Sequence, residues 1–230
     1  MLVENITLDV AIRDAVKSFR KNELAYLALT SKPEATLRDR IALRIRIQIA
    51  RTKLLLVVAR EFWKRVDLAV VDKTTCAPRV FVEMKCWHTA NVDGLKAALR
   101  KDISKCRNVL AHHEPRVPTY VVLALIHQDK PVEPALDRVV KYQRQIRRAY
   151  RNRTSARVLA EYMSSLTSAF PGMRRLAVPT FVGKEFGVGV EIHWLVVTPG
   201  SRRKPAKRRA QPGTLAVDRR RGSASGPEAR

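Results

Sequence analysis

Residues 64–87, KRVDLAVVDKTTCAPRVFVEMKCW, constrain the fold more than any other part of the chain. Two runs in this stretch, Arg65–Asp72 and Arg79–Cys86, are rich in Val, Leu and Phe. Between them lies a segment of turn composition, residues 73–78, which contains Pro, Thr and Lys. Two apolar runs around a short turn segment predict a β-hairpin.

Three charged side chains are expected to converge in this hairpin. A turn centred on residue 75 or 76 brings Asp67 level with the segment Glu83-Met84-Lys85. Alternate residues of a strand share a face, so Glu83 and Lys85 project together, on the face of Asp67, while Met84 turns the other way. Charges inside an apolar hairpin are costly unless they pair or hold a metal. The pattern therefore predicts either a metal site or a structural ion-pair cluster at a sheet edge.

The rest of the chain predicts helices alternating with strands. Helices are expected over residues 5–29, 34–47, 94–110, 137–151 and 156–170, and further strands over residues 53–62, 119–126, 176–186 and 188–197. The order strand, strand, helix, strand from residue 65 to residue 126 predicts an α/β sheet with a crossover helix. The almost wholly apolar run 119–126 is typical of a strand covered on both faces.

Two interpretations compete for the second of these helices. Glu34, Leu37, Ile41 and Ile45 fall on one helical face, and Ser31 with Glu34 three residues later fits a capping box. Residues 43–49, LRIRIQI, nevertheless alternate strictly between apolar and polar side chains, as a strand would. We favour the helix, with Glu34 either on the functional face or merely a capping residue.

The charge balance predicts a polyanionic partner. The chain has 45 Lys and Arg against 21 Asp and Glu, a net charge of +24, and such a field attracts nucleic acid above all. Residues 199–230 are dominated by Pro, Gly, Ser and Arg and are expected to form a disordered basic tail of net charge +8. Residues 1–198 therefore keep +16 and are expected to form one domain, with a core at 30–127, a basic helical segment at 135–170 and closing strands at 176–197.

One predicted helix carries a cationic stripe. In the basic helical segment, Lys141, Arg144, Arg148 and Arg151 recur at helical spacing beside an apolar stripe. The stripe is expected to contact the phosphates of nucleic acid, although a simple solvated face has the same pattern.

Cysteine usage and hydropathy indicate a cytoplasmic protein. The three cysteines form no disulfide framework, which is typical of a reducing compartment. No apolar run approaches membrane-spanning length and residues 1–21 lack the hydrophobic centre of a signal peptide, so no membrane partner is expected.

The converging residue types are suited to phosphodiester hydrolysis. The carboxylates of Asp67 and Glu83 and the backbone carbonyl of Met84 offer oxygen ligands to a hard cation such as Mg²⁺ or Mn²⁺. The cation would polarise a phosphate and lower the pKa of a bound water. Lys85 would position the attacking hydroxide or stabilise the developing oxyanion, and Glu34 would accept a metal-bound water or help to hold a second ion.

These residues, in the order helix, strand, strand, resemble the motif of the PD-(D/E)xK phosphodiesterase superfamily. The motif is carried by Glu34, then Val66-Asp67, then Glu83-Met84-Lys85. The resemblance covers about residues 30–127 and implies the restriction-endonuclease-like fold, a central mixed sheet flanked by helices. Val66 stands where the name of the family has Pro, a position at which the family is loose.

The resemblance also implies roles for individual residues. In the family, the residues that match Asp67 and Glu83 bind the divalent metal and the residue that matches Lys85 is catalytic. Glu34 fits the helical acid of the family better than Glu23, which is the second choice. Family members often dimerise to cut both strands, so a homodimer is an expectation, although no interface is identified.

The expected function is therefore metal-dependent cleavage of DNA. The second hypothesis is a DNA-binding or assembly module that keeps this fold but has no catalytic activity. The third is a ribonuclease or toxin-like effector with the same catalytic residues.

Overall fold

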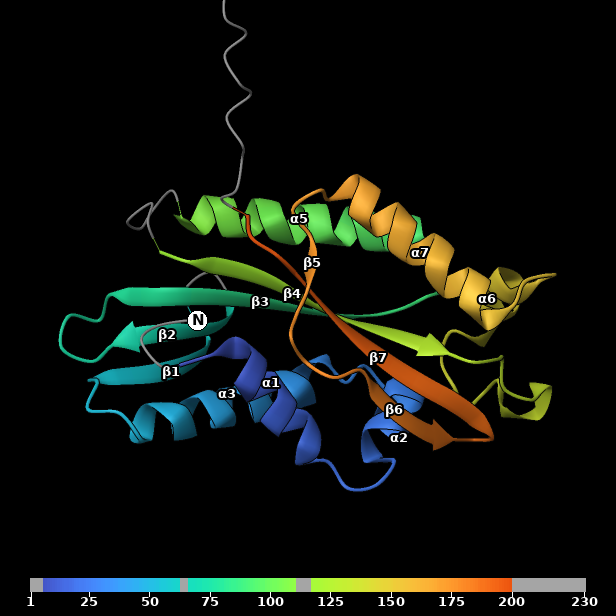
Figure 1. The fold of residues 1–230 in the computed structure, drawn as a ribbon, viewed down its shortest axis with the longest axis horizontal. Coiled ribbons are helices and arrows are strands. Elements are labelled where there is room, and N and C mark those ends of the chain that lie inside the picture. Colours follow the sequence, from blue (N-terminus) through green and yellow to red (C-terminus); the bar gives the residue numbers. More distant parts are fainter. Residues whose placement is uncertain (1–5, 63–65, 111–116, 200–230) are drawn as a thin grey trace, which may run out of the picture.

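A mixed β-sheet runs through the molecule, and helices pack on both of its faces (Figure 1). The computed structural model describes residues 6–62, 66–110 and 117–199. The strands are β1 (Leu56–Glu61), β2 (Val66–Asp72), β3 (Pro78–His88), β4 (Thr119–Gln128), β5 (Arg174–Arg175), β6 (Phe181–Glu185) and β7 (Val188–Val197). The described helices are α1 (Leu8–Lys17), α2 (Glu23–Thr30), α3 (Glu34–Ala50), α5 (Val92–Leu110), α6 (Gln143–Tyr150) and α7 (Ser155–Ala169), with a 3₁₀ turn at Pro134–Leu136.

The strand order confirms the predicted α/β sheet with a crossover helix. The seven strands run in the order β1-β2-β3-β4-β7-β5, and β6 also pairs with β7. β3 and β4 are parallel and are joined through α5, whereas the other pairs are antiparallel. A parallel pair needs such a crossover because its strands cannot be joined by a tight turn.

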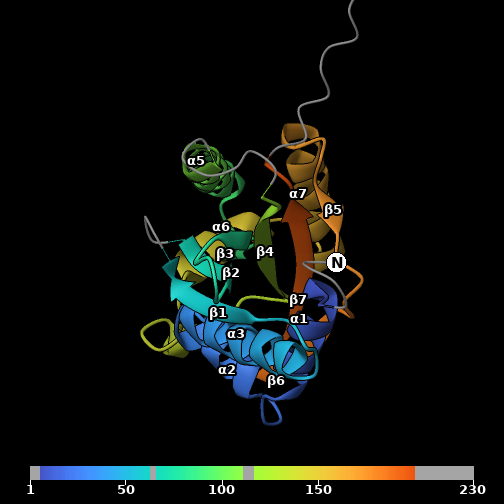
Figure 2. The ribbon, with the colours of Figure 1, turned by 90° about the vertical axis from the view of Figure 1, so that its left-hand side faces the viewer.

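The sheet separates two hydrophobic layers. In the end-on view, α1, α2 and α3 lie on one side of the sheet and α5 and α7 on the other (Figure 2). The larger core packs α1–α3 against one face, and a smaller core packs α5 and α7 against the opposite face. β4 contributes Val122 to the first core and Leu123 to the second, as its continuous apolar run predicted.

Residues 34–50 form one helix, so the strand interpretation of 43–49 is wrong. Leu37, Ile41, Ile45 and Ile49, at spacings of four residues, are all buried against the sheet. Leu43 is 51% exposed although it is as apolar as its neighbours. Tertiary burial at helical spacing has overridden the local alternation of side chains.

The predicted hairpin is present, with a β-bulge. β2 and β3 pair with Leu68 opposite Val82 and Val70 opposite Val80, which is a turn centred on residue 75. Nearer the turn the register changes by one, with Val71 opposite Pro78, which makes Arg79 the extra residue of the bulge. This bulge lies between the turn and Asp67 and determines which β3 residues are level with that carboxylate.

The basic segment after residue 134 is not the long helix that the sequence predicted. Of the predicted helix 137–151, only residues 143–150 form an α-helix, because Tyr142 adopts a left-handed conformation with φ of 65° that an α-helix cannot contain. Lys141 donates its backbone N–H to the Leu29 carbonyl instead of to a helical partner. Val139, which lies two helical turns before Ile146 in the predicted helix and so would share its apolar stripe, is 50% exposed.

Three smaller predictions are also corrected. Residues 18–22 separate α1 from α2, so 5–29 is not one helix. Of the predicted strand 176–186, only β6 forms a strand, and the two-residue strand β5 precedes it. The capping box at Ser31 is absent, because the Ser31 hydroxyl donates to the Leu27 carbonyl and closes the preceding helix.

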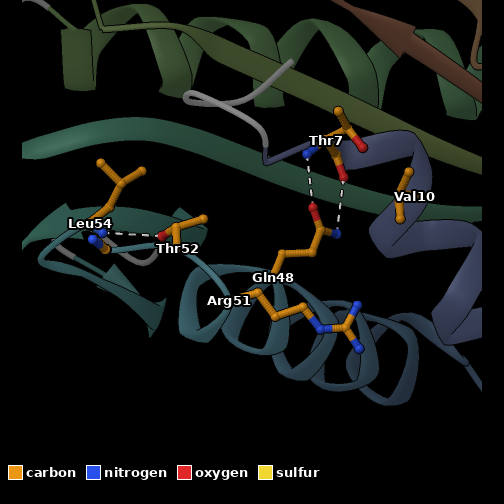
Figure 3. A pocket seen from close by; sticks show the side chains of 7 residues that line it. Thr7, Val10, Gln48, Arg51, Thr52 and Leu54 are labelled. Atoms are coloured by element: carbon orange, nitrogen blue, oxygen red, sulfur yellow. Dashed lines mark hydrogen bonds between the residues drawn. The ribbon is translucent and has the colours of Figure 1, made fainter.

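The end of α3 is fastened to the start of α1 by a side-chain amide. Thr7 donates its backbone N–H to Gln48 Oε1 at 2.9 Å, and Gln48 Nε2 donates to the Thr7 carbonyl at 3.3 Å (Figure 3). A hollow of about 490 Å³ adjoins this contact and is lined by Arg51 and Leu54 among others. The paired hydrogen bonds satisfy backbone groups at the first turn of α1, so we assign this region a structural role.

Within the described residues, no helix has the length and apolarity needed to cross a membrane. The predicted disordered tail falls, from residue 200 onward, outside the described residues.

Candidate active site

Asp67 and Glu83 lie side by side on adjacent strands, as the hairpin predicted. The Asp67 backbone N–H donates to Glu83 Oε2 at 3.4 Å, and Asp67 Oδ2 accepts from the Met84 backbone N–H at 2.8 Å. Glu83 is only 4% exposed, while 16% of the Asp67 side chain is exposed. Two carboxylates therefore meet at a point that solvent still reaches.

The site forms where β3 continues past the end of its pairing with β2. β2 pairs with β3 only as far as Val82, whereas the pairing of β3 with β4 continues to His88. On the edge of β3 that β2 leaves unpaired, backbone N–H groups donate to acidic side chains. The Met84 N–H donates to Asp67, and the Cys86 N–H donates to Glu34 Oε2 at 2.9 Å. The N–H and C=O of one strand residue point to the same side. The Met84 carbonyl therefore points towards the Asp67 side of β3.

Lys85 is held between helices from both faces of the sheet. Its Nζ lies 3.8 Å from Glu34 Oε1 on α3 and 3.4 Å from Asp102 Oδ2 on α5. Burial disfavours the ammonium form, but the charges of Glu34 and Asp102 outweigh it and raise the pKa of Lys85 above its ordinary value. Lys85 is therefore a fixed positive charge at neutral pH and not a proton acceptor.

Two further cations neutralise the carboxylate pair. Lys105 Nζ, from α5, lies 2.8 Å from both Glu83 oxygens, and Arg38 Nη1, from α3, lies 3.6 Å from Asp67 Oδ1. Arg38 also pairs with Glu61 at 3.1 Å. Each of the four acids at the site, Asp67, Glu83, Glu34 and Asp102, therefore has a cationic neighbour within 4 Å.

Burial changes the protonation of Glu83. Burial, helped by the nearby Asp67 charge, raises the pKa of Glu83 to about 7, and the hydrogen bonds from Lys105 oppose the shift. Burial likewise raises the pKa of Asp102, against the influence of Lys85. Because strongly shifted carboxyl groups gather at functional sites, this cluster is the strongest candidate in the described chain.

Asp102, Lys105 and Arg38 were not predicted from the sequence. Asp102 continues the buried stripe of α5, Leu95, Leu99, Cys106 and Val109, at spacings of three and four residues. An acid within an apolar stripe was the available signal, because a buried carboxylate requires a partner. Lys105, one turn further along α5, and Arg38 carried no such signal.

The structure places Glu34, and not Glu23, at the candidate site. Glu34 opens α3 and reaches both Lys85 and the Cys86 amide, and 32% of its side chain is exposed. Glu23 instead binds Arg40 Nη2 at 2.7 Å and accepts the Arg20 backbone N–H.

The residues present can hold a divalent ion only with help from water or substrate. Among the described residues, no three His, Cys, Asp or Glu side chains are arranged as a metal cluster. Asp67, Glu83 and the Met84 carbonyl supply oxygen atoms, and Mg²⁺ commonly takes one or two carboxylates and completes its shell with waters and phosphate. The donor set therefore suits Mg²⁺ or Mn²⁺ once Lys105 releases at least one oxygen of Glu83.

The four predicted nucleic-acid contacts do not share one helix. Lys141 precedes α6, Arg144 and Arg148 lie on it, and Arg151 follows it. None of the four forms an ion pair with an acid in the described part of the chain, whereas Arg147 pairs with Asp137 and both Arg153 and Arg157 pair with Glu161.

Comparison with known proteins adds no relative: no protein-family model, no curated protein and no solved structure matches the chain.

The raised pKa of Glu83 predicts a pH-dependent site. Between its ordinary value of 4.5 and about 7, the folded protein holds a proton that the unfolded chain has released, so the free energy of unfolding should fall as pH rises through this window. Glu83→Gln should remove this slope from urea denaturation curves. Lys105→Met should move the upper limit of the window to higher pH, because it removes the group that favours the carboxylate. The exposed Lys101→Met, on the same helix, is the control and should leave the window unchanged.

Proposed function

We propose that this protein is a metal-dependent nuclease that hydrolyses DNA phosphodiester bonds and has a restriction-endonuclease-like fold of the PD-(D/E)xK type. The observation that carries the proposal is the convergence of Asp67, Glu83 and Lys85 at the solvent-accessible edge of β3. The mixed sheet with helices on both faces and a crossover helix after β3 is consistent with it.

Each side chain of the site would have its own role in such a reaction. Asp67, Glu83 and the Met84 carbonyl would hold Mg²⁺ or Mn²⁺, which supplies Lewis acidity to the phosphate and a more acidic bound water. Lys85, kept protonated by Glu34 and Asp102, orients the attacking oxygen and stabilises negative charge on the phosphate. Glu34 faces the same space and can accept a hydrogen bond from water.

A direct assay tests the proposal. Supercoiled plasmid is incubated with the protein and Mg²⁺ or Mn²⁺, and with EDTA in parallel. The proposal expects metal-dependent nicking that is absent from Lys85→Ala while DNA binding by that variant persists. Tight binding without cleavage, across plasmid, branched and single-stranded DNA and both metals, would contradict it.

One observation favours a second candidate, a DNA-binding or assembly module without turnover. Lys105 contacts both oxygens of Glu83 at 2.8 Å and so occupies the place that a cation would take. In a module of this kind the cluster would serve only to tie α5 to β3.

The cations around α6 that form no ion pair, Arg144 and Arg148 among them, are proposed to bind phosphates. On duplex DNA, removing one phosphate contact reduces the slope of log affinity against log salt by about 0.9. We therefore expect the Arg144→Gln, Arg148→Gln double variant to weaken DNA binding for every sequence and to reduce the slope by about two. The measurement is fluorescence anisotropy at several salt concentrations.

The control for that measurement is Arg13→Gln with Arg157→Gln. Arg13 already pairs with Asp14, and Arg157 already pairs with Glu161. This control variant should change the slope less. If the wild type and the Arg144, Arg148 double variant had equal slopes of log affinity against log salt, these arginines would not contact the phosphates.

A further inference from the structure

A cavity of about 330 Å³ adjoins the candidate active site at the carboxyl ends of the parallel strands β3 and β4. Lys85 and Glu34 line one part of it, and the aromatic side chains of Trp87, His88 and Tyr142 line another. In open α/β sheets, ligands bind preferentially outside the carboxyl ends of the strands. A volume of this size accommodates a small ligand and not a double helix.

Contacts within the protein hold the aromatic side chains of the lining in place. Trp87 Nε1 donates to the Asn91 carbonyl at 3.0 Å, which fixes the edge of the indole ring. The His88 and Tyr142 rings lie 4.9 Å apart and are tilted by 44°. Tyr142 is held beside the cavity by its left-handed backbone, with φ of 65°, a conformation that is uncommon for a residue with a side chain. Such backbone strain is typical of positions where a side chain serves a ligand.

The ring nitrogens of His88, which are unpaired within the described residues, are a second indication that the cavity binds a ligand. His88 is 7% exposed, and neither ring nitrogen makes a hydrogen bond of normal geometry with a described residue, although the Ala28 backbone lies near enough to influence its protonation. Burial lowers the pKa of His88 to about 4, so the imidazole is neutral and retains one donor and one acceptor. Buried polar atoms without partners are rare and require an explanation.

The cavity continues into a second hollow that is lined by both arginines and acids. This hollow, of about 530 Å³, shares Ala90, Asn91 and Gln145 with the first. Its charged lining consists of Arg148, Arg153, Asp93 and Glu161. The common residues make one depression that leads from the Lys85 ammonium to the arginines of α6 and the segment after it. Its dimensions suit a nucleotide chain with a phosphate at Arg148, whereas Arg153 already pairs with Glu161 at 3.1 Å.

We infer that this cavity binds one unpaired nucleobase of the nucleic-acid substrate, next to the phosphodiester bond at Lys85. The inference rests on the proposed function and specifies its substrate. Stacking on aromatic faces is the usual means of holding an unpaired base, and Asn91 and Gln145 offer amide groups to its edge. A base within a duplex is stacked and paired, so it enters only if the strand is single or the base is flipped out. The protein should therefore prefer DNA that is single-stranded or contains an unpaired nucleotide.

The test measures binding without cleavage, in EDTA. A labelled single-stranded oligonucleotide, the matching duplex and a duplex with one unpaired nucleotide are compared by fluorescence anisotropy. The single strand and the interrupted duplex should bind more tightly than the perfect duplex. Tyr142→Leu should reduce affinity for these two by about 5- to 100-fold and leave the perfect duplex unchanged. Tyr142→Phe, which keeps the ring, should bind as the wild type does.

Two further arms keep the result independent of folding. Tyr26→Leu replaces a tyrosine on α2 that is 49% exposed and does not line the cavity, and it should bind normally. An oligonucleotide series that moves one abasic position along the strand should show one sensitive position with the wild-type protein and none with Tyr142→Leu. Equal affinity for single-stranded and duplex DNA, with no sensitive abasic position, would overturn the inference. Plasmid cleavage would still stand or fall separately, because no step of this test requires turnover.

Discussion

Asp67→Asn and Glu83→Gln should each lower the rate of metal-dependent DNA cleavage by about 10³-fold or more, as expected when a charged group is removed from a catalytic constellation. Both replacements keep the shape of the side chain and remove its charge. The amide side chain of Asp67→Asn would still present an oxygen atom to the Met84 N–H, which now donates to the aspartate at 2.8 Å. Neither variant should unfold, and both should bind Mn²⁺ more weakly in equilibrium dialysis.

The stability of Glu83→Gln follows from the protonation of Glu83. Because burial and Asp67 raise the pKa of Glu83 to about 7, the carboxyl group is already partly neutral near pH 7, and a neutral amide should be tolerated there. Asp39→Asn is the matched control. Asp39 is a half-exposed α3 carboxylate that pairs with Arg38 and Arg60 and does not contact Glu83. Wild-type cleavage by either site variant would remove that residue from the proposed metal site.

Leu37→Ala should lower the free energy of unfolding by about 2–5 kcal/mol, the range for a leucine truncated in a packed core. Leu37 is fully buried on α3 and belongs to the core that supports the face of the sheet opposite α5. Its truncation leaves a cavity that the helix can fill only by moving. Urea denaturation followed by circular dichroism measures the change.

Leu43→Ala, on the same helix, provides the comparison. Leu43 is 51% exposed, so the same chemical change should alter the free energy of unfolding by no more than about 0.5 kcal/mol. If the two variants were destabilised equally, the orientation assigned to α3 would be wrong, and with it the position of Glu34 and Arg38 at the site.

The hairpin and the charges on it could be predicted from the sequence because both depend on local rules. Val, Leu and Phe runs around a turn define two strands, and the two-residue period of a strand then decides that Asp67, Glu83 and Lys85 share a face. β4 was equally recognisable, because a strand buried on both sides has no polar face.

The remainder could not be predicted because it depends on distant contacts. The pairing of Lys105 with Glu83 depends on how α5 rotates over the sheet, and a lysine on a helix gives no indication of this. The end of the predicted basic helix at Tyr142 depends on the Lys141 amide binding the Leu29 carbonyl, from an element far earlier in the chain. Tertiary hydrogen bonds of this kind override local helical spacing.

Because of the bulge at Arg79, the geometry of the proposed site depends on the exact number of residues in β3. If the register of Val71 opposite Pro78 continued without a bulge, Asp67 would lie opposite Val82. The single extra residue of the bulge shifts the register by one, so that Glu83 lies level with Asp67. Deletion of Arg79 alone would join Pro78 to Val80 in a regular ladder and keep Glu83 level with Asp67. Deletion of one residue between the bulge and Glu83 would instead exchange the two faces of β3 relative to β2 and direct Met84 to where a carboxylate now lies. The proposed site therefore depends on the number of residues that separate the bulge from Glu83, and a one-residue deletion there would disrupt the site while leaving every proposed ligand in the sequence.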